Sequence, residues 1–165
     1  MDFLDVLLII SILTCSLVTG FIFTYAIVVM PGLSRLTDKE FIRAFKFTDG
    51  IIQKNQPLFM IAWIGSVISV LITMFSSIII TELAETFFVV LIGTFYLLGV
   101  QGITISIHLP LNKHIQNLNI DELSLQKLSE ERTKFEKKWN FFNKIRTTIA
   151  FAICLMFLVI LALRS

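Results

Sequence analysis

Four long stretches without a charged residue dominate the pattern of hydrophobic and polar positions. They run from Val6 to Met30, from Pro57 to Ile80, from Thr86 to Leu109 and from Thr147 to Leu163. A helix needs about 20 apolar residues to cross the hydrocarbon core of a bilayer, where no water satisfies the backbone. The pattern predicts an all-α integral membrane four-helix bundle in one domain, residues 1–165, with spans at about residues 4–30, 57–80, 86–108 and 141–163.

Composition excludes a water-soluble domain. The chain is 56% hydrophobic and 16% charged, whereas soluble domains are about 45–50% apolar and about 25% charged. Lipid is therefore the expected partner of much of the surface.

The basic residues indicate an orientation. Thirteen of the 14 Lys and Arg residues lie between the first and second stretches or from Lys113 to Arg146, and only Arg164 lies at the other end of the spans. The positive-inside rule predicts cytoplasmic segments at residues 31–56 and 108–140, with both termini outside the cell (inner or plasma) membrane. A cleaved signal peptide is the alternative for the first stretch, but Asp2 and Asp5 stand where it needs basic residues.

Two segments outside the spans carry helical signals. Thr37 and Glu40 form a capping box, and the apolar positions after them recur at helical spacing. We expect a short amphipathic cytoplasmic helix here, lying along the membrane surface or folded under the bundle. Pro110 is expected to end the third helix, and a long fourth helix, starting near Asn119, is expected to extend from the cytoplasm into the last span.

Small residues recur at four-residue spacing in three of the stretches. Ser16, Gly20 and Thr24 form the longest such stripe, and Gly65 with Ser69 and Gly102 with Ser106 repeat it. Small residues let helix backbones approach closely in lipid. We expect packing within the monomer, with a homodimer seam as the alternative.

Polar residues gather at the basic ends of the spans, where each costs free energy unless it is paired. They are Tyr25, Gln53, Gln101, Thr104, His108, Asn112, Trp139, Asn143, Arg146 and Thr147. Gln101, Thr104 and His108 share one helical face by their i, i+3, i+7 spacing. The set predicts a polar pocket between the helices, and the alternative is that Trp139 and Arg146 only anchor the fourth helix at the membrane interface.

Metal and nucleic-acid functions find no support. His108 and His114 are six residues apart with Pro110 between them, and no Cys, Asp or Glu cluster accompanies them. The charged run from Glu130 to Lys138 has mixed sign, which is typical of a solvated helix face. We therefore expect no metal, no cofactor and no nucleic-acid partner.

Several of these stretches together resemble the anthrone oxygenase-like membrane family. The resemblance rests on residues 20–25 with 29–33, residues 53–57 with Phe59, residues 104–112, and Trp139, Asn143, Arg146 and Thr147. It implies a four-helix membrane bundle and, for some members, oxidation of an anthrone to an anthraquinone by O2 without a recognised metal or flavin. This chain has His108 where the family usually has Asn, and Asp49 near another position that is usually Asn.

The resulting hypothesis is a cofactor-independent O2 oxidation of a lipophilic phenolic or polyketide-like molecule. His108 would act as the base, Asn143 and Arg146 would stabilise the enolate oxygen, and the other seven polar residues would bind the substrate. The alternatives are a non-enzymatic membrane subunit that holds a partner or forms a homo-oligomer, and a quinone-binding protein without turnover. A cavity of several hundred Å³ at these residues would favour ligand chemistry.

Overall fold

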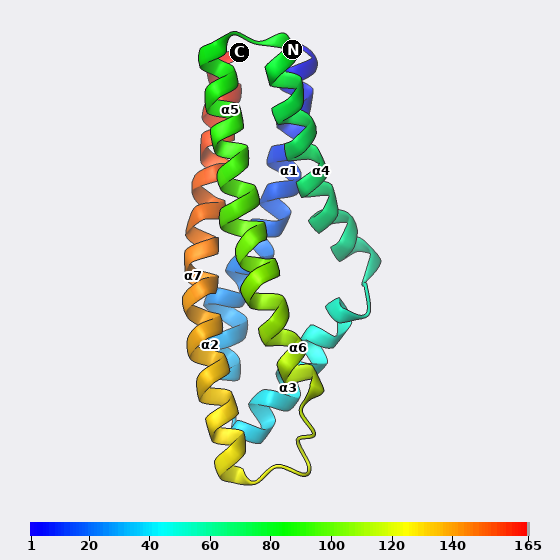
Figure 1. The fold of residues 1–165 in the computed structure, drawn as a ribbon, viewed down its shortest axis with the longest axis vertical. Coiled ribbons are helices and arrows are strands. Elements are labelled where there is room, and N and C mark those ends of the chain that lie inside the picture. Colours follow the sequence, from blue (N-terminus) through cyan, green and yellow to red (C-terminus); the bar gives the residue numbers. More distant parts are fainter. Residues whose placement is uncertain (165) are drawn as a thin grey trace.

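Four long helical segments form the fold in the computed structural model, which describes residues 1–164 (Figure 1). The first comprises α1 (Phe3–Thr24), the π-helical η1 (Tyr25–Val29) and α2 (Met30–Leu33), and the second is α4 (Pro57–Ile80). The third comprises α5 (Leu83–Phe95), the π-helical η2 (Tyr96–Gly102) and η3 (Thr104–His108), and α6 (Leu109–Asn117). The fourth is the single helix α7 (Leu125–Arg164). All four are long and apolar enough to cross a membrane, which confirms the predicted all-helical membrane fold.

The outer surfaces of these helices remain apolar. On α4, Ile61 is 68% exposed and Ile79 is 81% exposed, and a row of large apolar side chains connects them. Such a row would cost free energy in water, and lipid removes this cost. The exposed row therefore marks the lipid-facing side of α4.

Hydroxyl pairs and close contacts join the spans. Ser11 and Thr14 of α1 hydrogen-bond to Thr73 and Ser69 of α4, each at 2.9 Å. The turn between α4 and α5 makes these helices antiparallel neighbours, as their short connection predicts (Figure 1).

Side chains of neighbouring helices lie closest to the backbone at two glycines outside the predicted stripes. A Cβ at Gly93 would lie 2.7 Å from Met74 Cγ, and one at Gly99 would lie 3.0 Å from Ile149. Ser16, Gly20 and Thr24 are instead exposed, and a Cβ at Gly20 would meet nothing within 4 Å. Packing of the small residues within the monomer holds only in part. Ser16 hydrogen-bonds to Cys154 of α7 at 3.8 Å, and Ser69 of the second stripe bonds Thr14 of α1. Gly20 lies off the face that α1 buries, which carries Cys15 and Ile22.

The amphipathic helix after the first span is α3 (Asp38–Gln53). The predicted capping box is present, since Thr37 and Glu40 each bond the other's backbone N–H. Phe41 and Phe45 of α3 pack on Phe135 of α7. Of the two alternatives, α3 therefore takes the position folded under the bundle.

Two predicted helix boundaries differ from the structure. The third helical segment continues through Pro110 to Asn117, and α7 begins at Leu125 rather than near Asn119. The π-helical turn before Pro110 pairs the Leu109 N–H with the Thr104 carbonyl, five residues back. This wider turn accommodates the proline ring, which clashes with a carbonyl in a regular α-helix. Ser124, whose hydroxyl accepts the Lys127 N–H, supplies the α7 start.

The end of the bundle opposite α3 is closed by ion pairs. Arg164 binds Asp5 at 2.7 Å and also pairs with Asp2 and Glu85, so it joins α7 to α1 and α5. The acidic ends thus meet the single basic residue on their side of the spans.

Candidate functional site

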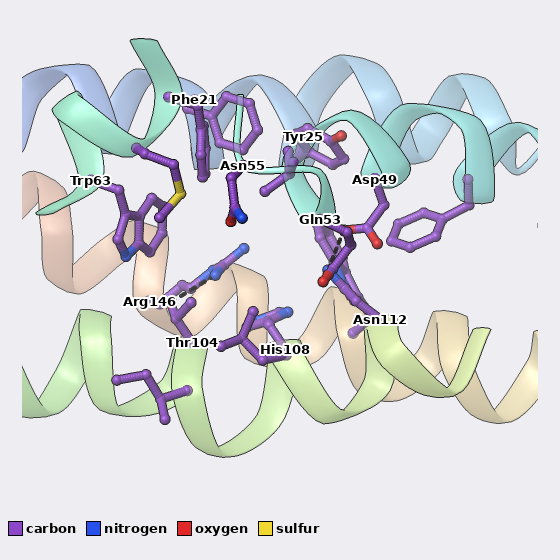
Figure 2. Close-up of a pocket in the computed structure, with 17 residues that line it drawn as sticks. Phe21, Tyr25, Asp49, Gln53, Asn55, Trp63, Thr104, His108, Asn112 and Arg146 are labelled. Atoms are coloured by element: carbon purple, nitrogen blue, oxygen red, sulfur yellow. Dashed lines mark hydrogen bonds between the residues drawn. The ribbon is translucent and has the colours of Figure 1, made fainter. Parts of the chain in front are cut away.

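A cavity of about 330 Å³ lies between the helices near the base of the uncharged stretches (Figure 2). Its walls come from the α1–η1 junction, the C-terminal half of α3, the start of α4, η3 with the start of α6, and α7. Its volume is that of a small-molecule site, at the low end of the usual range of about 300–1,000 Å³.

Arg146 supplies the positive charge of the cavity. Its side chain is 5% exposed, and it donates from Nε to Asn143 Oδ1 and from Nη1 to Thr104 Oγ1, both at 2.9 Å. No carboxylate pairs with it among the described residues. A buried cation without a counterion is costly unless other groups stabilise it. The guanidinium is therefore suited to bind an anionic or electron-rich oxygen in the cavity.

His108 comes from η3 and lies beside Arg146 of α7 in the cavity wall (Figure 2). It is 2% exposed, and neither ring nitrogen has a hydrogen-bond partner within residues 1–164. Its ring meets Trp139 edge to face, with centroids 5.0 Å apart. An unpaired buried imidazole nitrogen costs about 1–3 kcal/mol, so the ring is held by packing while its nitrogens remain free for a ligand.

A hydrogen-bonded chain fixes Trp139. Its Nε1 donates to Asn112 Oδ1 at 3.0 Å, and Asn112 Nδ2 donates to Asp49 Oδ1 at 2.7 Å. The Trp139 ring faces the Arg146 guanidinium, 5.7 Å from the ring centroid. This cation–π contact and the edge contact to His108 make Trp139 more than an interfacial anchor.

The opposite wall is aromatic and comes from α1 and the start of α4. Phe59 stacks on Trp63 at 5.4 Å, and Phe21 meets Phe59 edge to face at 4.9 Å. Flat apolar walls favour a planar aromatic ligand. The cavity thus combines an apolar aromatic side with a polar side.

Backbone irregularities surround the cavity. Tyr25, Thr104 and His108 lie on π-helical turns, which are rare and occur frequently at functional sites. Asn55, in the α3–α4 turn, is the one described non-glycine residue with a positive φ, at 57°. Asn tolerates this left-handed conformation. The turn brings its amide to the cavity opposite Arg146 (Figure 2).

Seven of the ten residues predicted for the site line this cavity: Tyr25, Gln53, Thr104, His108, Asn112, Trp139 and Arg146. Asn143 does not line it. Its side chain accepts from Arg146 and donates to the Ile22 carbonyl at 3.1 Å, so it orients the Arg146 guanidinium from behind the cavity wall.

The other two predicted residues are also outside the wall. Gln101 donates to the Tyr96 hydroxyl at 3.0 Å, in a polar cluster with Ser66. Thr147 is buried, and its hydroxyl has no hydrogen-bond partner among the residues that the structure describes. A helical face predicts direction but not depth, which is why these residues share the pattern without reaching the cavity.

Sequence reasoning missed the contribution of Asp49. It is 2% exposed on α3 and accepts from Asn112 and from Gln116 Nε2, the latter at 2.9 Å. Burial raises the pKa of the Asp49 carboxyl above its ordinary value, and the Gln116, Gln53 and Asn112 amides oppose that rise. An acidic residue on the apolar face of an amphipathic helix was the available signal.

No cluster of three or more His, Cys, Asp or Glu side chains able to hold a metal occurs within residues 1–164. His114 lies apart from His108, on the surface, where it pairs with Glu131 at 2.7 Å. The two histidines therefore do not form a common site.

Fold and cavity together define a helical membrane protein with an internal cavity lined by aromatic and polar side chains. Residues 53–156 match the family described as anthrone oxygenase, so the chain belongs to the anthrone oxygenase family. Comparison with curated proteins and with solved structures found no significant match.

Proposed function

We propose that the protein oxidises a lipophilic, anthrone-like phenolic molecule with O2. One observation carries the proposal: within residues 1–164, a buried arginine without a counterion and a buried histidine with unpaired nitrogens line the same aromatic-walled cavity. The family's description agrees with this chemistry. The same cavity supports ligand chemistry over a purely scaffolding role.

His108 acts as the base in this proposal. It removes a proton from the methylene carbon of the anthrone, and the negative charge moves to the carbonyl oxygen. Arg146 stabilises that oxygen with its donors, held in place by Asn143 and Thr104. Because these donors are already oriented, little reorganisation accompanies formation of the anion.

The anion then supplies electrons to O2. A carbon–oxygen bond forms, and the histidinium returns its proton to give a hydroperoxide on that carbon. Loss of the remaining carbon-bound hydrogen, with cleavage of the O–O bond, releases water and leaves the second carbonyl. One anthrone and one O2 thus give one anthraquinone and one water, and the ring carbon is oxidised as both oxygen atoms are reduced.

The proposed orientation places the cavity at the cytoplasmic side of the cell membrane, because the basic segments flank it. Exposed apolar side chains such as Ile105 and Leu109 accompany the polar lining on η3 and α6. A lipophilic substrate would reach this wall from the surrounding lipid.

The experiment measures O2 uptake and anthraquinone formation by the purified protein in lipid nanodiscs supplied with anthrone. The wild-type protein should convert anthrone above the uncatalysed rate, and His108→Ala should lower turnover by about 10²–10⁴-fold, the usual contribution of a positioned base. His114→Ala is the matched control, because it removes the other histidine at an exposed ion pair.

Thermal unfolding of both variants separates chemistry from folding. A folded His108→Ala variant with full turnover would remove His108 from the mechanism. A wild-type protein that binds anthrone in the cavity without converting it would instead favour the quinone-binding alternative.

A further inference from the structure

Two opposite charges face the cavity without meeting. Arg146 lies at one end of it and Asp49 at the other (Figure 2). No ion pair joins either side chain to another within the described chain. A molecule that spans the cavity therefore meets a cation at one end and a carboxyl group at the other.

We infer that Asp49 is a specificity-determining residue that accepts a hydrogen bond from a hydroxyl group of the ligand, at the end remote from Arg146. The inference rests on the proposed function only in the identity of the ligand skeleton. It adds a requirement to that skeleton: an electron-rich oxygen for Arg146 and an O–H donor for Asp49.

The surroundings of Asp49 leave it able to accept this bond. Its two oxygens accept from Asn112 at 2.7 Å and from Gln116 at 2.9 Å. The Gln53 amide is a third hydrogen-bonding neighbour of the carboxylate. A carboxylate has about four acceptor positions, so three amide donors do not exhaust it. Lys46, the nearest cation along α3, instead donates to the Leu118 carbonyl.

The amides around Asp49 also fix its direction. Gln116 donates to the Lys46 carbonyl at 3.0 Å as well as to Asp49, which prevents its amide from turning round. Asn112 is held by Trp139, whose Nε1 donates to the Asn112 side-chain oxygen. A carboxyl group oriented by two fixed donors is preorganised, and such a site rejects a ligand that lacks the matching donor.

A purely structural role is the competing explanation, because Asp49 also fastens α3 to α6. The two roles differ in what they change. A structural role changes stability and the binding of all ligands together, whereas a specificity role changes the ratio between ligands with and without a hydroxyl group.

The test compares binding of anthrone, 2-hydroxyanthrone and 2-methoxyanthrone without O2, in nanodiscs. Both tryptophans of the chain line the cavity, so quenching of their fluorescence reports binding directly. The wild-type protein should bind the hydroxylated probe about tenfold or more tightly than the other two, as expected for a hydrogen bond to a charged group. The methoxy probe keeps the oxygen but lacks the O–H donor. This comparison uses only the wild-type protein, so its result does not depend on whether a variant folds.

Asp49→Asn should reduce this preference to about threefold or less, because a neutral acceptor forms a weaker hydrogen bond. Asp5→Asn is the matched control, a buried acid at the opposite end of the bundle, and it should keep the wild-type ratio. Equal binding of the hydroxy and methoxy probes, or an unchanged ratio in Asp49→Asn, would overturn the assignment.

The outcomes separate the two proposals. Turnover of anthrone without a hydroxyl preference overturns the role of Asp49 alone. An Asp49-dependent preference without turnover of any probe overturns the oxygenase and leaves the binding site in place.

Discussion

Replacing Arg146 with Met tests the electrostatic centre of the site. The substitution keeps an unbranched side chain of similar length and removes the charge together with the hydrogen bonds to Asn143 and Thr104. It also ends the cation–π contact with Trp139. The change therefore affects both the stability of the bundle and the binding of an anionic oxygen.

The two effects differ in size. Each hydrogen bond from a charged group is worth about 1.5–3 kcal/mol, but desolvating an unpaired ion costs several kcal/mol. These terms oppose one another, so we expect the free energy of unfolding to change by no more than about 2 kcal/mol. In the reaction, by contrast, no gain offsets the loss of the donors that stabilise the anion. Losing an oxyanion donor costs roughly 10²–10³-fold in turnover.

The assay measures kcat/KM for anthrone in nanodiscs alongside the thermal unfolding midpoint. Arg146→Lys should retain binding of the anion but recover only part of the turnover, because one ammonium cannot replace the planar fork that reaches Asn143, Thr104 and the ligand together. Arg35→Met is the matched control, since Arg35 is an exposed arginine away from the cavity. Turnover of Arg146→Met within threefold of wild type, in a folded protein, would refute the reasoning about the oxyanion.

Three further predictions concern packing, pH and orientation. Gly93→Val should destabilise the bundle by about 1–3 kcal/mol, since Met74 and Val70 leave no room for it, whereas Gly20→Ala should not, as unfolding midpoints will show. Because the folded state raises the pKa of Asp49 above its ordinary 3.8, the folded protein holds that proton more tightly than the unfolded chain. The stabilisation of wild type relative to Asp49→Asn should therefore be largest below about pH 4 and decline as pH rises through the folded-state pKa, and a rise instead would contradict this sign. An impermeant maleimide added outside the cell should label Glu82→Cys and not Lys134→Cys; the reverse would invert the proposed orientation.

Short-range constraints explain what the sequence determined. The absence of charge over about 20 residues is incompatible with anything but a spanning helix in lipid, so the four spans follow directly. The Thr37–Glu40 capping box involves groups three residues apart, and it formed as predicted. Helical spacing also placed Thr104 and His108 on one face of the third segment, where both line the cavity.

Tertiary packing decided the details of the site. Asn143 has the polarity and depth of a ligand-binding residue, but the nearby Ile22 carbonyl and Arg146 engage its side chain. Asp49 reaches the cavity only because α3 folds under the bundle, an arrangement that local spacing left open between two alternatives.

The same limit applies to the backbone. Pro110 predicted the end of a helix, and a π-helical turn that no pattern announced allowed the helix to continue. Gly20 and Gly93 are equivalent by composition, yet only Gly93 meets another helix closely.

The sequence by itself determined which segments lie in lipid, because that depends on composition within one segment. Only the tertiary structure decided which polar groups face a common cavity, because that depends on how the helices rotate against one another.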